Sequence, residues 1–227
     1  MTVGAGAVYY NPPCRQKIVV RVPAAETNGE RSILDLYVGP GGFAADYHIH
    51  PFSEERFTLV RGRLRVYIDG QNVILDEVGQ TVAVQPGAKH RFFNAAEHEE
   101  TFAVVEFRNR ADRFENLLLC QLFGLAEDGK TDAHGIPNLL QGAVTMLEFS
   151  DVLRFARRPW PVQRALYTAL APIARLLGYQ GCNPMYLKRR PTETEELEEL
   201  PWEVSEHYKG YRKPFSVSLL TGVSIPQ

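Results

Sequence analysis

The sequence predicts a mainly β fold, an antiparallel β-sandwich or β-barrel, followed by an α-helical extension. Three observations support this. Up to about residue 110, short runs rich in Val, Ile, Phe and Tyr alternate with turn residues, which is typical of all-β domains. After residue 110, apolar residues recur at helical spacing. The 227 residues, 44% of them hydrophobic, are enough to bury a core without disulfides.

Seven segments of the first part are predicted strands, because each is a short β-branched or aromatic run between turn signals. They are Gln16–Val22, Ser32–Val38, Phe57–Val60, Leu64–Ile68, Val73–Leu75, Thr81–Val84 and Thr101–Phe107. Asp69-Gly70 separates two of these runs and is a strong hairpin signal.

Three helices are predicted in the second part. The first carries its apolar face at Phe114, Leu117, Leu118, Leu122 and Leu125. The second covers Leu139–Phe149. The third has apolar positions at Val162, Leu166, Leu170, Ile173 and Leu177. Pro172 is expected to kink or split this third helix, since proline lacks the amide donor, and Gly178 is expected to end it.

Composition excludes several classes of protein. With 25 basic and 27 acidic residues the net charge is −2, which argues against a general nucleic-acid binder. Cys14, Cys120 and Cys182 are odd in number and form no CxxC pair, so we expect neither a disulfide framework nor a thiolate zinc site. A reducing compartment fits this cysteine usage. The first residues lack the pattern of a signal peptide and no run of about 18 apolar residues occurs, so we expect a cytoplasmic protein.

The segment from Gly42 to Gly62 contains most of the candidate metal-binding residues. His48 and His50 are two apart, and on a strand this spacing points both imidazoles to one face. Glu54 and Glu55 follow, and His90 comes soon after a Pro-Gly turn. Imidazoles on one face with a nearby carboxylate are a minimal ligand set for a divalent metal ion.

Two motifs in this region resemble those of the cupin superfamily. The first motif is matched by Gly42, His48, His50, Glu55 and Gly62, and the second by Gly79, Gly87, His90 and Asn94. The six-residue spacing before Gly62 selects Glu55 over Glu54. Pro86 directly precedes Gly87 instead of lying one residue earlier, which shifts the turn but keeps the spacing to His90. The resemblance covers residues 15–110 or so, and the helical part is similar to that of bacterial single-domain cupins.

The resemblance implies a cupin-type antiparallel β-barrel, the double-stranded β-helix or jelly roll. It implies that His48, His50, Glu55 and His90 bind one divalent metal ion inside this barrel. We expect Fe(II) or Mn(II) first, while Zn(II), Ni(II) and Cu(II) are also compatible with these ligands. Four protein ligands leave up to two positions of an octahedral ion open, as catalysis requires.

The sequence therefore suggests three functions in order. The first is a metal-dependent oxygenase or oxidoreductase that acts on a small, largely apolar substrate of aromatic, polyketide or terpenoid type, with Glu55 as both ligand and catalytic base. The second is a non-redox isomerase, cyclase or lyase, in which the ion acts as a Lewis acid. The third is a small-molecule binding or sensing module. The resemblance also implies a homodimer.

We expect residues 1–110 to form the barrel with its metal site, residues 111–190 a helical extension packed on the barrel, and residues 191–227 an acidic segment and tail. Phe215–Ile225 is expected to form an edge strand or ordered tail. We interpret Phe57, Phe92 and Phe107 as residues of the barrel core, and the alternative is that they form the wall of a pocket. Asn94 is expected to end a strand or cap a turn.

The last predicted helix lies in a basic stretch. Between Val152 and Arg190 there are eight Arg or Lys residues and no acidic residue, and five glutamates follow between Glu193 and Glu199. One interpretation is an amphipathic element with Trp160 that contacts anionic lipid at a membrane surface. The favoured interpretation is a packing helix over the barrel, whose charges are neutralised by the adjacent glutamates.

Overall fold

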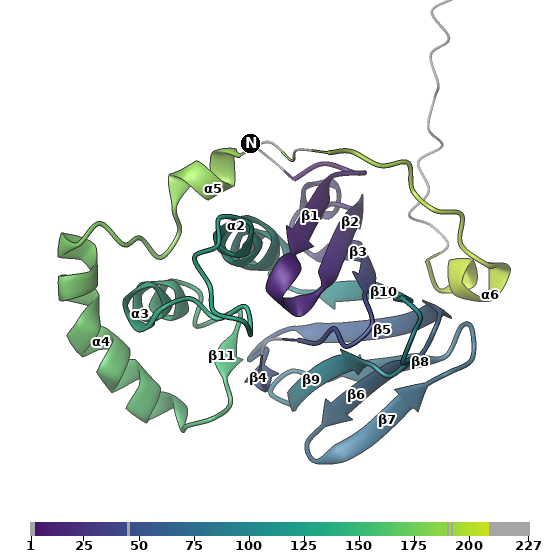
Figure 1. The fold of residues 1–227 in the computed structure, drawn as a ribbon, viewed down its shortest axis with the longest axis horizontal. Coiled ribbons are helices and arrows are strands. Elements are labelled where there is room, and N and C mark those ends of the chain that lie inside the picture. Colours follow the sequence, from purple (N-terminus) through teal and green to yellow (C-terminus); the bar gives the residue numbers. More distant parts are fainter. Residues whose placement is uncertain (1–2, 45, 190, 192, 209–227) are drawn as a thin grey trace, which may run out of the picture.

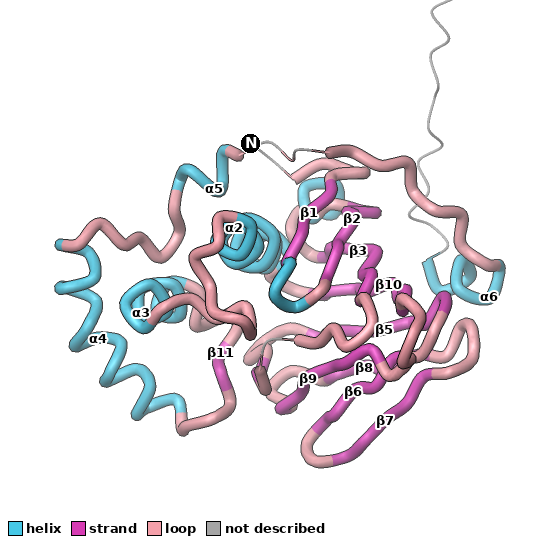
Figure 2. Tube along the Cα trace, in the orientation of Figure 1, coloured by secondary structure: helices cyan, strands magenta, loops and turns pink. Residues whose placement is uncertain are grey.

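The computed structural model describes residues 3–44, 46–189, 191 and 193–208. It contains two antiparallel sheets with helices gathered mainly at one end of them (Figures 1 and 2). The six-stranded sheet has the order β1-β2-β3-β10-β5-β8. Its strands are β1 (Val8–Asn11), β2 (Gln16–Val22), β3 (Arg31–Val38), β10 (Thr101–Arg108), β5 (Glu54–Arg61) and β8 (Thr81–Val84). The predicted fold class, a cupin-type barrel with a helical C-terminal part, is confirmed.

The five-stranded sheet has the order β11-β4-β9-β6-β7. Its strands are β11 (Arg154–Phe155), β4 (His48–Ile49), β9 (Lys89–Asn94), β6 (Leu64–Ile68) and β7 (Gln71–Leu75). The predicted hairpin joins β6 to β7, and its two central residues Asp69 and Gly70 have φ of 47° and 86°. Positive φ at both positions is what a two-residue turn needs to match the twist of its strands.

Two motif glycines have structural reasons of their own. Gly62 ends β5 with φ of 83°, and a Cβ there would lie 2.9 Å from the Cα of Thr101. At Gly42 a Cβ would lie 2.6 Å from a methyl carbon of Val38. A side chain at either position would force the neighbouring chain to move. Close packing therefore requires glycine at both positions, which flank His48 and His50 in the sequence.

The main hydrophobic core lies between the sheets and continues into the helical part. Alternating residues of the strands, such as Leu36, Phe57 and Val105, supply the β side of this core. Phe114 and Met146 from the helices belong to the same cluster. The predicted boundary at residue 110 therefore crosses a shared core, and the division of the chain into domains stays a prediction.

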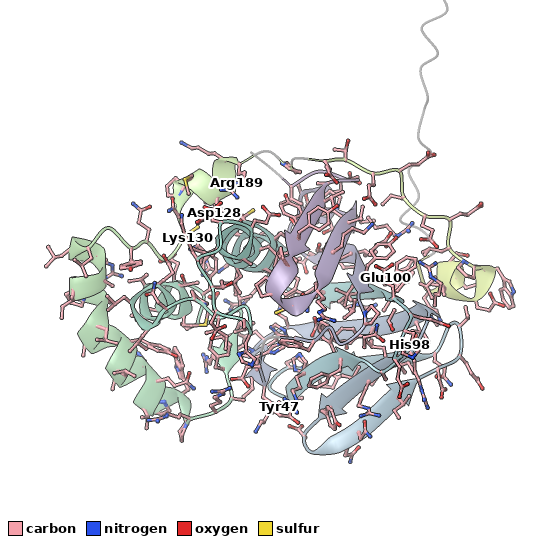
Figure 3. The ribbon with its side chains drawn as sticks, in the orientation of Figure 1. Tyr47, His98, Glu100, Asp128, Lys130 and Arg189 are labelled. Atoms are coloured by element: carbon pink, nitrogen blue, oxygen red, sulfur yellow. The ribbon has the colours of Figure 1, made fainter. Side chains whose placement is uncertain are left out.

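The first helical segment runs without a break from Ala111 to Glu127. It consists of α1 (Ala111–Glu115), a π-helical stretch η3 (Asn116–Leu122) and α2 (Phe123–Glu127). Helix α3 (Leu139–Glu148) agrees with the second prediction, and the side chain of Asn138 caps its first turn. Short helices α5 (Pro184–Lys188) and α6 (Trp202–Ser205) follow later. Asp128 holds α5 in place through Arg189 at 2.7 Å and Tyr186 at 2.9 Å (Figure 3).

Helix α4 (Trp160–Leu176) continues through Pro172, so the helix is not split at this residue. Pro172 and Thr168 are both exposed, so the carbonyl group that loses its amide partner faces water. Gly178 has φ of 87° and ends the helix as predicted. Among the described residues, no helix is both long and apolar enough to cross a membrane.

The acidic segment covers the outer face of the six-stranded sheet. Leu197, Leu200 and Val204 pack there on a second apolar cluster. Its glutamates pair with sheet residues: Glu195 with Lys17 at 2.9 Å, and Glu198 with Arg61 at 2.7 Å.

The favoured interpretation of the basic stretch is therefore wrong about its charges, because the acidic segment lies on a different face of the molecule (Figure 1). Helix α4 packs mainly on α3, and its Tyr167 packs against the main core. The predicted element Phe215–Ile225 lies outside the described residues.

Candidate metal centre

The four predicted ligands come together inside the barrel. His48 lies in β4 and is paired in register with His90 of β9, while His50 follows directly after β4. Glu55 reaches the same point from β5 in the opposite sheet. One ligand atom from each residue can be chosen so that all four lie within 4.8 Å of one another. The cluster is compatible with a single metal ion.

All three imidazoles are oriented in the same way. Each Nδ1 contacts a backbone carbonyl oxygen, and a carbonyl only accepts, so each Nδ1 carries the proton and donates it. The acceptors are Asp46 for His48 at 2.9 Å, Val152 for His50 at 2.8 Å and Ala88 for His90 at 3.1 Å. In the neutral rings the lone pair is therefore on Nε2. Such backbone contacts are the usual way in which proteins orient metal-binding histidines.

The contacts at the centre fit a bound cation. The Nε2 atom of His50 is buried without a hydrogen-bond partner, because the Glu55 carboxylate is 3.6 Å away. His90 meets an acceptor at both nitrogens, with Glu55 Oε2 at 2.8 Å from Nε2. A neutral imidazole cannot donate from both nitrogens, whereas a divalent ion between these groups would satisfy the lone pairs of His50, His90 and Glu55 together.

The electrostatics favour the protonation states of ligands. Burial lowers the pKa of His48 well below its ordinary value, and the neighbouring imidazoles of His90 and His50 lower it further. Burial alone would raise the pKa of Glu55, but His50 and His90 outweigh this and hold it below its usual range. A neutral imidazole and an ionised carboxylate are the forms that bind metal.

The helical extension takes part in this centre. The carbonyl of Val152, just after α3, orients His50. Phe114 of α1 stacks on Phe107 with ring centroids 3.7 Å apart, and both rings lie edge-on to His50. The site is thus completed by residues beyond the predicted barrel.

A cavity opens beside the cluster and encloses about 870 Å³ of space not filled by atoms, with solvent at its mouth included. The walls are mostly aliphatic and aromatic, and His48, His50 and Glu55 form part of them. None of the lining residues within the described part of the chain is Lys or Arg. The apolar walls are Ile18, Leu34, Leu36, Ala44, Phe92, Val105, Phe114, Leu118, Leu122, Phe123, Pro137, Leu153 and Phe155.

Three polar residues of the cavity were missed by sequence reasoning: Asn11, Gln16 and Asp46. The Oδ1 atom of Asn11 is buried without a partner, which makes this amide a candidate contact for a polar group of a bound molecule. Asp46 is buried and pairs with Arg157 from the loop before α4. Asn11 and Gln16 lie far from the motifs in the chain, and no local pattern marks them.

The remaining predicted residues lie elsewhere. Glu54 points away from the cluster and pairs with Arg56 at 3.0 Å. His98, His134 and His207 are exposed, as expected of surface histidines (His98 is labelled in Figure 3).

The aromatic and amide candidates divide between core and cavity. Phe57 and Phe107 are fully buried in the core, whereas Phe92 lines the cavity. Asn94 ends β9, as predicted. Its side chain donates to the carbonyls of Val38 and Glu99.

Comparison with known proteins supports the fold. Residues 35–106 match the family described as Cupin domain. These residues contain both motifs and all four members of the cluster. No curated protein matches the chain.

Several solved structures resemble the chain at low identity. An oxalate oxidase is 22% identical, with 70% of this chain and 74% of that chain covered and a TM-score of 0.39. A predicted oxalate decarboxylase from Thermotoga maritima is 16% identical, with 41% and 80% covered and a TM-score of 0.38. A sugar phosphate isomerase from Silicibacter pomeroyi is 16% identical, with 44% and 63% covered and a TM-score of 0.37. No activity is carried from these proteins to this chain.

Proposed function

The chain belongs to the cupin superfamily, and from this premise we propose that it is a metal-dependent enzyme that oxidises a small, largely apolar organic molecule with O₂. One observation carries the proposal. Three imidazoles and one carboxylate converge beside an apolar cavity. Each imidazole donates its Nδ1 proton to a backbone carbonyl oxygen. Such an arrangement supports a single ion with open positions beside a bound molecule.

The ligand set supports a divalent ion of intermediate hardness. His48, His50, Glu55 and His90 would hold it, and Fe(II) or Mn(II) are the ions we expect first. When bound, such an ion supplies Lewis acidity and positions at which O₂ and a substrate oxygen can meet. The protein excludes bulk water around it, because His50, Glu55 and His90 are buried.

The cavity supports an apolar substrate. Its described lining residues include no Lys or Arg, while Glu55 and Asp46 contribute carboxylates. Apart from Arg157, which pairs with Asp46, a dianionic substrate would find no described cation there other than the metal ion. An aromatic, polyketide or terpenoid molecule with one or two oxygen substituents suits these walls better, since its body replaces water against Leu, Ile and Phe side chains.

Glu55 would have a second task besides holding the ion. Its carboxylate lies at the cavity wall within 2.8 Å of His90 Nε2. A substrate hydroxyl or enol that reaches the open positions would lie near this carboxylate, which could take up its proton as a general base.

The test begins with the metal content of the protein as isolated. We expect about one ion per chain. His48→Ala and His90→Ala are each expected to reduce this content at least tenfold, since each removes a direct ligand. Elemental analysis of the purified proteins measures it. His98→Ala removes an exposed imidazole and serves as the matched control, with unchanged metal content.

Full metal content in both ligand variants would reject the assignment. Uptake of O₂ with phenolic or polyketide compounds then tests the reaction class. Turnover that persists without O₂ and with Zn(II) would replace oxidation by isomerase, cyclase or lyase chemistry. Tight binding of such a compound without turnover would indicate a binding or sensing module instead of an enzyme.

A further inference from the structure

Helix α4 exposes a stripe of large apolar side chains to solvent. Ten large hydrophobic residues are exposed among the described residues, and five of them lie in this helix or at its end. They are Val162 (52% exposed), Leu166 (44%), Ile173 (54%), Leu176 (88%) and Leu177 (65%). Such a concentration on one element marks an interaction surface, whereas single exposed apolar residues need no explanation.

The stripe lies on a different face from the one that packs. Helix α4 contacts α3 through Ala171 and Ala174, and Gln163 is also buried. Val162, Leu166, Ile173 and Leu177 are spaced four, seven and four residues apart, so they share one face about a third of a turn away. The helix therefore has one apolar face for the protein and another without a described partner.

Cations without a described partner accompany this stripe, with Arg164 and Arg175 on the opposite side of the helix from it. Arg158, Arg164 and Arg175 are exposed, and no carboxylate of the described chain pairs with them. No acidic residue occurs between Val152 and Arg190 in the sequence. The nearest acidic run pairs with Lys17 and Arg61 on the outer face of the six-stranded sheet. The positive charge along α4 is thus left for an external partner.

We propose that α4 is a membrane-surface helix that lies on anionic lipid, with its apolar stripe at the level of the acyl chains and its arginines among the headgroups. The combination of an apolar face and unpaired arginines is typical of helices that lie in the interface of a membrane. The helix has 17 residues and does not qualify as a span, so the contact is peripheral.

The positive charge of α4 favours anionic lipid as its partner over a second copy of the chain. A two-fold contact through the stripe would bury its apolar side chains but would leave the arginines on the other side of the helix without a partner. An anionic surface neutralises the same arginines. The observed charges therefore favour lipid over self-association.

Vesicle co-sedimentation of the full chain tests this proposal without knowledge of substrate or metal. The probes are vesicles of phosphatidylcholine alone and of phosphatidylcholine with one-third phosphatidylglycerol. We expect binding to the anionic vesicles that weakens as salt rises, because salt screens exposed charges. Changing Arg164 and Arg175 together to Gln is expected to weaken binding on the order of 30-fold, since each basic residue contributes about fivefold. Ile173→Glu is expected to weaken it about tenfold or more.

Two variants serve as matched controls and should bind like the unchanged chain. Val78→Glu places the same charge on an exposed apolar residue between β7 and β8 (48% exposed). Changing Arg61 and Arg63 together to Gln removes two exposed charges of the sheet. Circular dichroism and thermal unfolding check that all variants are folded. Absence of binding to anionic vesicles, or an equal loss of binding in the controls, overturns the proposal. A dimer in solution that Ile173→Glu dissociates into monomers also overturns it.

Discussion

Side-chain orientation at the metal centre depends on backbone carbonyls. His48 and His90 are held by the carbonyls of Asp46 and Ala88, two residues earlier in each case, so local strand geometry sets their tautomer. His50 instead depends on Val152, 102 residues away in the chain. The sequence spacing thus explains two of the rings, while the third needs the extension to fold against the barrel.

A second buried carboxylate, Glu115, gives a pH prediction. Burial raises its pKa to about 7, even though Ser32 Oγ and the backbone amide of Ala24 donate to it at 2.7 Å each. The folded protein therefore holds this proton more tightly than the unfolded chain. Its contribution to stability is fully present below about pH 4.5 and is lost as the pH rises through about 7.

Glu115→Gln keeps an acceptor for both donors and removes the charge. We expect the variant to be more stable than the unchanged chain at pH 8, by up to about 3 kcal/mol, and the difference to vanish as the pH falls below about 4.5. Urea unfolding at several pH values measures the difference. Glu97→Gln changes a carboxylate that is 90% exposed and should show no such trend. Parallel curves for Glu115→Gln would contradict the assignment.

Among the elements, the helical segment from Ala111 to Glu127 has the most direct effect on the cavity. Its π-helical stretch η3 brings Leu118 and Leu122 to the cavity wall, while Leu117 and Leu119 are buried in the core. A π-turn carries one extra residue per turn and shifts the faces of the helix on either side of it. The segment can therefore supply both core and cavity residues within a few positions.

This predicts that Leu122 limits the space for an apolar ligand. Leu122→Trp adds a ring at the cavity wall and should weaken binding of a neutral apolar fluorophore, N-phenyl-1-naphthylamine, about tenfold. Fluorescence titration measures the affinity. Leu139→Trp, at an exposed position (57%) at the start of α3, is the control and should leave the affinity unchanged. Equal affinities in the two variants would show that the probe binds outside the cavity.

At the scale of the whole molecule, the barrel and the helical extension share one hydrophobic core, which contains Phe57, Phe107, Phe114 and Phe149. The acidic segment covers the other side of the six-stranded sheet with Leu197 and Leu200. Both faces of that sheet are therefore covered by parts of the chain that follow residue 110.

A chain that ends after residue 110 should consequently aggregate and lose the metal site. It would expose Phe107 and the cavity, and it would leave His50 without its carbonyl partner. Size-exclusion chromatography and elemental analysis measure both effects. The full chain is the control and should stay monodisperse and loaded. A soluble, metal-loaded 1–110 fragment would show that the barrel folds independently.

The sequence by itself determined the β-rich first part and the helical second part, and its resemblance to the cupin motifs singled out the four residues of the candidate centre. These features depend on local signals: alternation in strands, turn glycines such as Gly62, and the HxH spacing that puts two imidazoles on one face. Each signal acts between residues close in the chain, so it can be read without the fold. The same holds for α3, which Asn138 caps, and for the end of α4 at Gly178.

Only the tertiary structure decided which surfaces meet. The periodicity of α4 predicts an apolar face, but the helix packs through Ala171 and Ala174 and leaves Ile173 in solvent. Proximity in sequence also suggested the wrong partners for Glu195 and Glu198. Asn11 and Leu122 are likewise far apart in the chain, yet both line the cavity. Packing between distant segments depends on shape and burial across the whole chain, and no short stretch of sequence encodes it.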